Sequence, residues 1–442
     1  MDKEKEISRR DFLKIGVASF AGLALNRPLK EIDNFFKSSE FESLNKISFR
    51  KDRVMEVNGQ AVFPLGLYYL PGIESPETWE KMGKSGFNLI NQWWVNDETL
   101  ASAEKNGIYT MAFLQYAFPN IENSGEIDLG RLEKLKESKS FIGIYGADEP
   151  LGKSNLYLQS LNKLQKELPD NPISSVFYEN STTLNAGPLD FREYKKSYQG
   201  EQTDLICLPD FATADEFAFW FIKKSKTEIV SFDYYNNSNV LGVDSVTEKY
   251  IQNLKNGNFG PNAKALWVTL SAHSEIPLTF KEMRFQAIDV IARGATGILW
   301  WDWPSGCSSA NCPGFPDKGT AYSVHWPDLQ NIMRELTDVG DGLIGEEKLL
   351  GLSESEKVAF KITKSNTSRH YIITATHSKD QDSKFRENLS THLTNKYFQV
   401  LGEKRIVKTN DKGELFDDYG FMDARIYVEI PKRGSSHAKY KR

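Results

Sequence analysis

Residues 141–150 read Phe141-Ile142-Gly143-Ile144-Tyr145-Gly146-Ala147-Asp148-Glu149-Pro150, an uncharged run that ends in two acids and a proline. A short apolar run of this kind is typical of a strand buried on both faces of a parallel sheet. Pro150 favours extended geometry at Glu149, so the strand is expected to end with that carboxyl facing its C-terminal end. Burying two carboxylates is costly unless they are hydrogen-bonded or paired, which indicates a functional role. The alternative is that either acid caps the following helix.

Similar runs alternate with longer amphipathic stretches from about residue 54 onward. This alternation predicts βα units with a parallel sheet, and eight units in ~250 residues is the number that closes a (β/α)₈ TIM barrel. We therefore predict an α/β barrel over residues 54–344. Leu205–Pro209 could be an additional strand, but a segment leading into the next helix is favoured. The predicted strands are 62–70, 87–94, 108–115, 141–147, 173–178, 227–233, 265–271 and 297–303, and the predicted helices are 76–84, 97–106, 128–138, 154–167, 214–225, 245–255 and 279–293.

The pattern changes after about residue 345. Residues 357–363, 369–375, 397–401 and 424–430 are short apolar runs separated by polar turns, which is typical of antiparallel strands. They predict a small C-terminal antiparallel β-sandwich over residues 345–432, followed by a basic tail at 433–442.

The N-terminus carries the pattern of an export signal. Ser8-Arg9-Arg10-Asp11-Phe12-Leu13-Lys14 matches the twin-arginine motif, and residues 15–25 are apolar but too few to span a bilayer. A paired arginine on a surface helix is the alternative. We expect a signal peptide at 1–26 that engages the twin-arginine export machinery, a linker at 27–53, and a location in the periplasm, at the cell surface or outside the cell. Signal cleavage and retention as an anchor are both open, and membrane contact is expected only through this segment.

Composition narrows the functional classes. The 442 residues have a net charge of −5 with scattered lysine and arginine, which argues against nucleic acid as a partner. Phosphate loops and Rossmann glycine patterns are absent from the sequence, so no cofactor is predicted. Cys307 and Cys312 could form a disulfide that closes a loop, whereas a zinc site would need four ligands, so no metal is predicted. Cys207 lies in an apolar run and is expected to be buried.

In a TIM barrel the reactive groups lie at the C-terminal ends of the strands. Glu149 is the first candidate for a catalytic residue. Aromatic, amide and acidic side chains follow other strands, and they suit a sugar platform with hydrogen-bonding acids; simple packing of the tryptophans at the mouth is the alternative. Tyr68, Tyr69 and Gln115 point to the same end. The candidate substrate-binding residues are Trp93, Trp94, Asp148, Asp233, Tyr234, Trp301, Asp302 and Trp303.

Asp148-Glu149-Pro150 resembles the Asn/Asp-Glu-Pro element of glycoside hydrolase clan A. Residues 277–286 and 294–298 resemble the segment before the last strand of β-galactosidase-like barrel hydrolases, and 416–419 resembles the end of their β-sandwich. The resemblance spans roughly residues 55–432. It implies that Glu149 is the acid/base and that the nucleophile is a glutamate that ends the seventh strand. Glu275 lies a few residues beyond that place, and it could instead be a solvated loop acid.

These features predict hydrolysis of O-glycosidic bonds in a polysaccharide or oligosaccharide. Retaining hydrolysis needs two carboxyl groups ~5 Å apart, and inverting hydrolysis needs ~6.5–9.5 Å. Glu149 would act as acid/base with Glu275 as its catalytic partner, and Asp233 or Asp302 as substitutes. The alternatives are a non-catalytic carbohydrate-binding or scaffold protein on a degenerate barrel, and a polysaccharide lyase or transglycosidase on the same scaffold.

Overall fold

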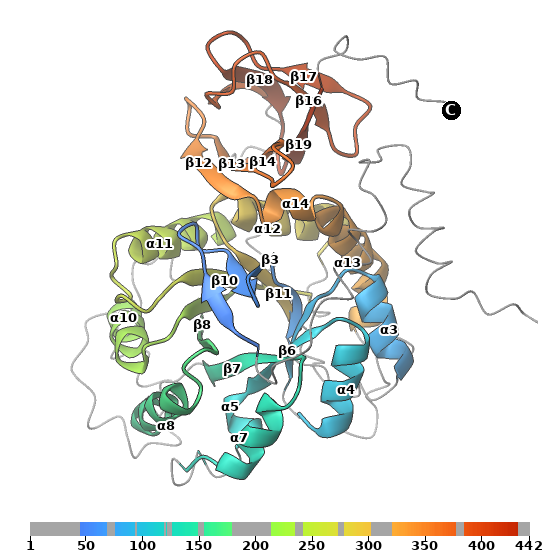
Figure 1. The fold of residues 1–442 in the computed structure, drawn as a ribbon. Helices are drawn as coiled ribbons and strands as arrows, with labels where there is room; N and C mark the ends of the chain where they lie inside the picture. Colours follow the sequence, from blue (N-terminus) through green and yellow to red (C-terminus); the bar gives the residue numbers. More distant parts are fainter. Residues whose placement is uncertain are drawn as a thin grey trace, which may run out of the picture. The chain divides into compact units, whose positions relative to one another are not determined.

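Eight parallel strands close into a barrel ringed by helices (Figure 1). The computed structural model describes residues 45–68, 76–92, 95–118, 121, 126–148, 154–178, 214–234, 242–272, 278–301, 321–376 and 384–431. The strands follow one another around the barrel in chain order, and the last pairs with the first, which confirms the predicted (β/α)₈ fold. They are β4 (Leu65–Tyr68), β5 (Leu89–Gln92), β6 (Tyr109–Phe113), β7 (Phe141–Asp148), β8 (Ile173–Tyr178), β9 (Ile229–Tyr234), β10 (Ala265–Ser271) and β11 (Gly297–Trp301).

Each of the seven predicted helices is present. They are α3 (Pro76–Lys84), α4 (Asp97–Lys105), α7 (Leu129–Lys136), α8 (Ser154–Glu167), α10 (Ala214–Ser225), α11 (Val243–Lys255) and α12 (Phe280–Ala292). Thr279 and Glu282 form a capping box that fixes the start of α12. The sequence did not predict α5 (Leu114–Ala117), α13 (Ala321–Asp338) or α14 (Gly340–Leu343). In α13, Pro327 lies inside the helix, and a proline normally signals its end. Within the described ranges, no helix is both long and apolar enough to cross a membrane.

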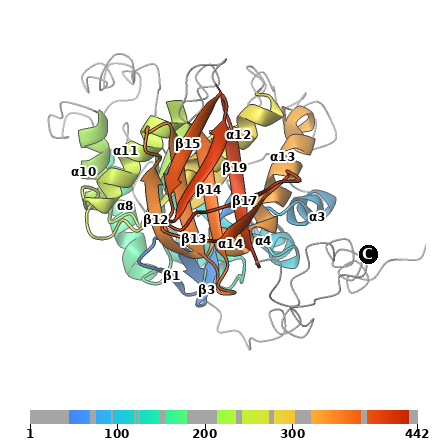
Figure 2. The ribbon, with the colours of Figure 1, turned by 90° about the horizontal axis from the view of Figure 1, so that it is seen from above.

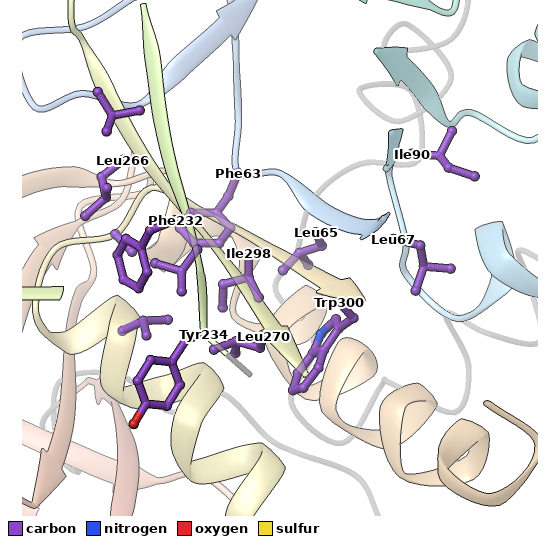
Figure 3. Close-up of a cluster of buried hydrophobic side chains, with 14 of the residues drawn as sticks. Phe63, Leu65, Leu67, Ile90, Phe232, Tyr234, Leu266, Leu270, Ile298 and Trp300 are labelled. Atoms are coloured by element: carbon purple, nitrogen blue, oxygen red, sulfur yellow. The ribbon is translucent and has the colours of Figure 1, made fainter. Parts of the chain in front are cut away.

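Successive side chains of the barrel strands point alternately into the lumen and toward the helices. The helix-facing side chains form the larger core, part of which Figure 3 shows. In the lumen, Gly297 makes room for a bulky neighbour, because a Cβ there would lie 2.6 Å from Cδ1 of Trp267. The lumen core consists of Tyr68, Leu89, Met111, Phe113, Ile142, Tyr145, Ile229, Ala265, Trp267 and Leu299, together with Ile47, Met55 and Val57.

A small antiparallel sheet closes the N-terminal end of the barrel. It comprises β1 (Ile47–Phe49), β2 (Met55–Val57) and β3 (Gln60–Val62), and its apolar side chains pack against the lumen core. Asn45 fastens it by donating to the carbonyl oxygens of Lys139 and Phe141, just before and at the start of β7. The sequence did not predict this sheet, and β1 falls inside the range 27–53 expected to be a linker. Strands of three residues are too short to produce a recognisable hydrophobic period.

The C-terminal part is a two-layer β-sandwich, as predicted. A six-stranded antiparallel sheet packs one face on a two-stranded sheet, and the buried side chains between them form a separate core. Four of these strands were not predicted, and two of them, β15 and β18, bury only alternate residues of polar segments. The large sheet runs β12 (Glu346–Leu352), β13 (Val358–Lys364), β14 (His370–Thr376), β19 (Ala424–Ile430), β16 (Tyr397–Val400) and β17 (Ile406–Lys408), and the small sheet pairs β15 (Phe385–Ser390) with β18 (Glu414–Tyr419).

The other face of the large sheet packs on α12 of the barrel (Figure 2). Ala359, Ile373 and Ile426 of the sheet belong to the same core cluster as the helices around the barrel. Arg284 of α12 joins the two parts, because it binds the Glu335 carboxylate of α13 with two hydrogen bonds and donates to the carbonyl oxygen of Ala424. The sandwich is therefore continuous with the barrel core over residues Ser43–Arg442.

Candidate active site

The fourth strand leads the chain to the acid pair that the sequence singled out. β7 ends at Asp148, whose backbone pairs with Val176 of β8. Glu149 is therefore the residue that follows the end of the fourth barrel strand. The side chain of Asp148 and all of Glu149 lie outside the described residues.

A register shift precedes this acid pair. Tyr145 pairs with Ser174 and Asp148 with Val176, so three steps along β7 match two steps along β8. Gly146 permits the close approach, because a Cβ at this position would lie 2.4 Å from the carbonyl oxygen of Ser174. Bulges are frequent beside active sites because they redirect the end of a strand. The bulge thus shifts the last residues of β7 relative to β8, just before the described part of the strand ends.

Asp233 lies near the end of the sixth strand, on the lumen side. Its neighbours Phe232 and Tyr234 both belong to the helix-facing core, so the alternation of the strand turns Asp233 inward. It pairs with Thr269 of β10 and its residue is only 3% exposed. The structure therefore positions one carboxylate inside the barrel near the C-terminal ends of the strands.

Trp301 is the last residue of the eighth strand. It pairs with Ser271 of β10, is half-buried, and packs against the lumen core. In TIM barrels, side chains from alternate strands form a common layer, and strands six and eight are of one set. Asp233 pairs with Thr269, and Trp301 pairs with Ser271, two residues further along β10. Because the strands of a barrel are tilted and staggered, this offset of two residues across two strands puts Asp233 and Trp301 in the same layer at the mouth. An acid and an indole thus share this layer.

An aromatic group lies in the lumen on β4, β6 and β7, and β4 is the strand next to β11. The ring centroids of Tyr68 and Tyr145 are 5.1 Å apart in an edge-to-face contact, and those of Phe113 and Tyr145 are 4.8 Å apart. Tyr116 contacts Phe113 at 5.5 Å and is half-buried. Of these, only Tyr68 was expected at the mouth. The two-residue period of β6 could have placed Phe113 in the lumen, whereas Tyr116 lies on the unpredicted helix α5.

Gln115 follows the third strand and was also expected near the mouth. Its Nε2 donates to the hydroxyl of Tyr157 on α8 at 3.1 Å. Since α8 is the helix after the fourth strand, this bond ties the end of the third βα unit to the fourth. Gln115 is half-buried, so part of its side chain stays exposed to solvent.

Tyr234 does not belong to this site, which corrects the expectation that it binds substrate. It is fully buried in the core between barrel and helices, as is Trp300 (Figure 3). The sequence placed Tyr234 beside Asp233, and two successive residues of a strand necessarily face opposite sides. The other predicted site residues lie outside the described residues. They are Glu275, Trp93, Trp94, Asp302 and Trp303, and the same holds for the disulfide candidates Cys307 and Cys312.

Carboxyl groups with raised pKa can mark functional sites, but the two whose pKa is raised to about 7 among the described residues lie away from the mouth. Burial raises the pKa of Glu228 to about 7, and this residue precedes β9 at the opposite end from Asp233. Burial also raises the pKa of Asp289 to about 7, on the helix α12 outside the barrel. Among the described residues, no group of three or more His, Cys, Asp or Glu is arranged to hold a metal ion.

Several solved structures have a similar course of the chain. A glycoside hydrolase family 5 protein from Bacteroides vulgatus is 10% identical with a TM-score of 0.49, over 87% of this chain and 93% of that one. A glucosidase from Croceicoccus marinus is 10% identical with a TM-score of 0.44, over 84% and 96%. An Anoxybacillus α-amylase is 9% identical with a TM-score of 0.43, over 88% and 100%. No protein-family model matches the sequence, and no similar curated protein is found. At these identities and TM-scores the likenesses carry no conclusion about reaction or substrate.

Proposed function

We propose that the protein is a glycoside hydrolase that cleaves O-glycosidic bonds of a polysaccharide or oligosaccharide at the C-terminal end of the barrel. The observation that carries the proposal is the common layer of Asp233 and Trp301. This layer lies at the end of the barrel where β7 ends at Asp148 and Glu149 follows in the sequence. A carboxylate beside an indole face fits a sugar, because the ring stacks on the indole while its hydroxyls bond the acid.

In this proposal Glu149 protonates the leaving oxygen as the glycosidic bond breaks. A second, ionised carboxylate must attack the anomeric carbon or activate a water. Asp233 is the acid at the mouth whose position supports this role, and Glu275 and Asp302 are the alternatives from the sequence. Asp148 and a platform of tryptophans would bind the sugar; the platform would consist of Trp93, Trp94, Trp301 and Trp303.

The test is Glu149→Gln, assayed on a panel of 4-nitrophenyl glycosides and polysaccharides. We expect hydrolysis to fall at least a thousandfold while the thermal unfolding curve stays that of the wild type, since Gln keeps the shape but cannot donate the proton. Glu137→Gln removes an exposed carboxyl at the end of α7 and should leave turnover unchanged. Undiminished turnover in Glu149→Gln would refute the assignment. A wild-type protein that binds glycans but cleaves none would favour the binding-protein alternative.

We further propose export through the twin-arginine machinery, supported by Ser8–Lys14 and the apolar residues that follow. Replacing Arg9 and Arg10 by Lys should retain the protein in the cytoplasm, as measured by cell fractionation. Unchanged export of that variant would contradict this route.

A further inference from the structure

A group of charged side chains lies where the N-terminal sheet, the β-sandwich and α11 meet, away from the mouth of the barrel. Arg53, in the turn between β1 and β2, donates from Nη2 to both carboxylate oxygens of Glu347 on β12, at 3.2 and 3.3 Å. Nζ of Lys361 on β13 lies 3.7 Å from Oε2 of the same carboxylate. Lys255, the last residue of α11, interacts electrostatically with both Arg53 and Glu347. We call these four residues, together with Arg50 and Asp52, the junction cluster.

The junction cluster contains more cations than carboxylates. Asp52 accepts two hydrogen bonds from the Arg50 guanidinium and a third from the backbone N–H of Glu347. Glu347 is therefore the carboxylate that the other three cations share. Two arginines and two lysines thus face two acids, which leaves an excess of two positive charges within the cluster.

Much of this charge is removed from water. The side chain of Lys361 is 2% exposed, and those of Arg53 and Glu347 are each 15% exposed. Nε of Arg53 is buried and has no hydrogen-bond partner among the described residues. A charged donor that has lost its hydration without gaining an acceptor destabilises the folded protein. The cluster therefore lacks acceptors that a bound anion would supply.

The lysines are affected by this imbalance. Burial lowers the pKa of Lys361, and the nearby Arg53 adds to this effect against the attraction of Glu347. Burial and Arg53 also lower the pKa of Lys255. A bound anion would oppose both shifts, because a neighbouring negative charge favours the ionised ammonium. Lys255 is exposed, so an anion can approach the cluster from solvent on that side.

The alternative is that the junction cluster only fastens the sandwich to the N-terminal sheet. An ion-pair network with that role is expected to balance its charges, since an uncompensated buried charge is destabilising. The backbone of Arg53 also has a φ of 70°, a conformation that is unfavourable for a residue with a Cβ. An arginine at a strained position, within an excess of cations, favours a ligand over a purely structural role.

We propose that the junction cluster binds a small doubly charged oxyanion, phosphate or sulfate, between Arg53, Lys361 and Lys255. Two negative charges match the excess of the cluster. A guanidinium donates along fixed directions to the oxygens of such an anion, and an ammonium adds a compact positive charge. The buried Lys361 forms the inner end of the site and the exposed Lys255 its solvent side. The site lies at the end of the barrel opposite the mouth, so it does not depend on the proposed hydrolytic function.

Isothermal titration calorimetry with sodium phosphate and sodium sulfate, at constant ionic strength, tests the site on the whole protein. We expect one anion to bind per chain, and chloride to bind at least ~10-fold more weakly because it brings one charge and no array of oxygens. Lys361→Met should weaken phosphate and sulfate binding at least ~10-fold, because a charge-assisted hydrogen bond is lost. Absence of binding, or equal affinity for chloride, would overturn the inference.

Two further variants make the test independent of how Lys361→Met folds. Lys255→Met changes an exposed residue and should weaken binding about three- to tenfold. Lys348→Met is the matched control: it removes a lysine of β12 that pairs with Glu346, and it should leave the affinity unchanged. Wild-type affinity in both Lys361→Met and Lys255→Met would show that the anion binds elsewhere and would refute the site.

Thermal unfolding provides a second readout. An anion at 100 times its Kd should raise Tm by ~3 °C in a protein of this size. Sulfate also stabilises proteins in general, so the comparison is between Lys361→Met, which should lose the specific increase, and Lys348→Met, which should keep it. Equal increases in the two variants would contradict the proposal.

A crystal structure of the wild-type protein grown with phosphate or sulfate locates the anion. We expect its oxygens within hydrogen-bond distance of Nε of Arg53 and Nζ of Lys361. An anion found only at other surface positions would overturn the inference.

Discussion

Replacing Arg293 by methionine tests how the helices on one side of the barrel are held together. Arg293 caps the C-terminus of α12, and its side chain is 1% exposed. Its Nε donates to both carboxylate oxygens of Asp289 at 3.0 and 3.1 Å, its Nη1 binds Glu248, and its Nη2 lies 3.8 Å from Oδ2 of Asp244. One guanidinium thus serves three carboxylates and joins α12 to α11.

The expected loss of stability follows from the burial of the carboxylates that would lose their partner in Arg293→Met. Asp289 and Asp244 have side-chain exposures of 0% and 5%. Removing one partner of a buried ion pair typically costs ~3–5 kcal/mol, because the remaining charge is uncompensated. Unfolding entropy is ~2.1 cal/mol/K per residue, so over roughly 400 residues this loss lowers Tm by about 5 °C.

The loss should grow with pH. Burial, with help from Asp244, raises the pKa of Asp289 to about 7, and Arg293 opposes that rise. Because this folded-state pKa is above the ordinary value of 3.8, the stability due to the bound proton is complete at low pH. It is lost as pH rises through about 7. Without Arg293 the pKa of the Asp289 carboxyl rises further. Raising the pH therefore lowers the free energy of unfolding more in the variant than in the wild type.

The assay is differential scanning calorimetry of both proteins at pH 5.5 and pH 8. We expect the difference in Tm to be larger at pH 8 by ~1–2 °C, from a cost of ~1.4 kcal/mol per pKa unit. Arg284→Met is the control, because it leaves a single carboxylate, Glu335, that water can reach at 18% exposure. A Tm change below ~1 °C in Arg293→Met at pH 8 would refute the reasoning.

Three further outcomes follow from the structure. Gly146→Ala should cost about 1–3 kcal/mol, measured by chemical denaturation, because its Cβ would lie 2.4 Å from the carbonyl oxygen of Ser174. Trp301→Ala should lower kcat/KM about 10- to 100-fold, whereas Tyr234→Phe, on the helix-facing side, should keep it within about twofold; equal effects would contradict the two orientations. Burial raises the pKa of Asp417, but hydrogen bonds from arginine and tyrosine outweigh it and lower the pKa below 3.8. Its stabilisation is therefore present at neutral pH and lost on acidification, so the Tm gap to Asp417→Asn should close below about pH 4.

The fold could be predicted because each barrel strand carries its own signal. β7, β8 and β10 are short, mainly apolar runs that helical segments separate from one another. Their bounds agree closely with the predicted ranges. The strands that escaped prediction are those of three residues, such as β1, and those with one polar face, such as β18. Their stability comes from tertiary packing, which no local pattern records.

The candidate site was less predictable, because it depends on which face each strand residue takes. Asp233 and Tyr234 are adjacent in sequence, and both looked suitable for a sugar site. A shift of one residue in the strand would exchange their roles. The hydroxyls of Ser231 and Thr269 gave no signal at all, since serine and threonine are ordinary in strands. Only the pairing of β9 with β10 brings them together beside Asp233.

The lumen is chemically asymmetric, and this asymmetry decides at which end an ionised side chain can lie. At its base the N-terminal sheet adds Ile47, Met55 and Val57 to lumen side chains that are already apolar. An ionised carboxylate there would lose its hydration without compensation, which costs many kcal/mol. Toward the mouth the neighbours include the hydroxyls of Ser231 and Thr269, so the carboxylate of Asp233 is recessed beside polar side chains. A carboxylate that must stay ionised yet shielded from bulk solvent is therefore compatible only with the mouth end of the lumen.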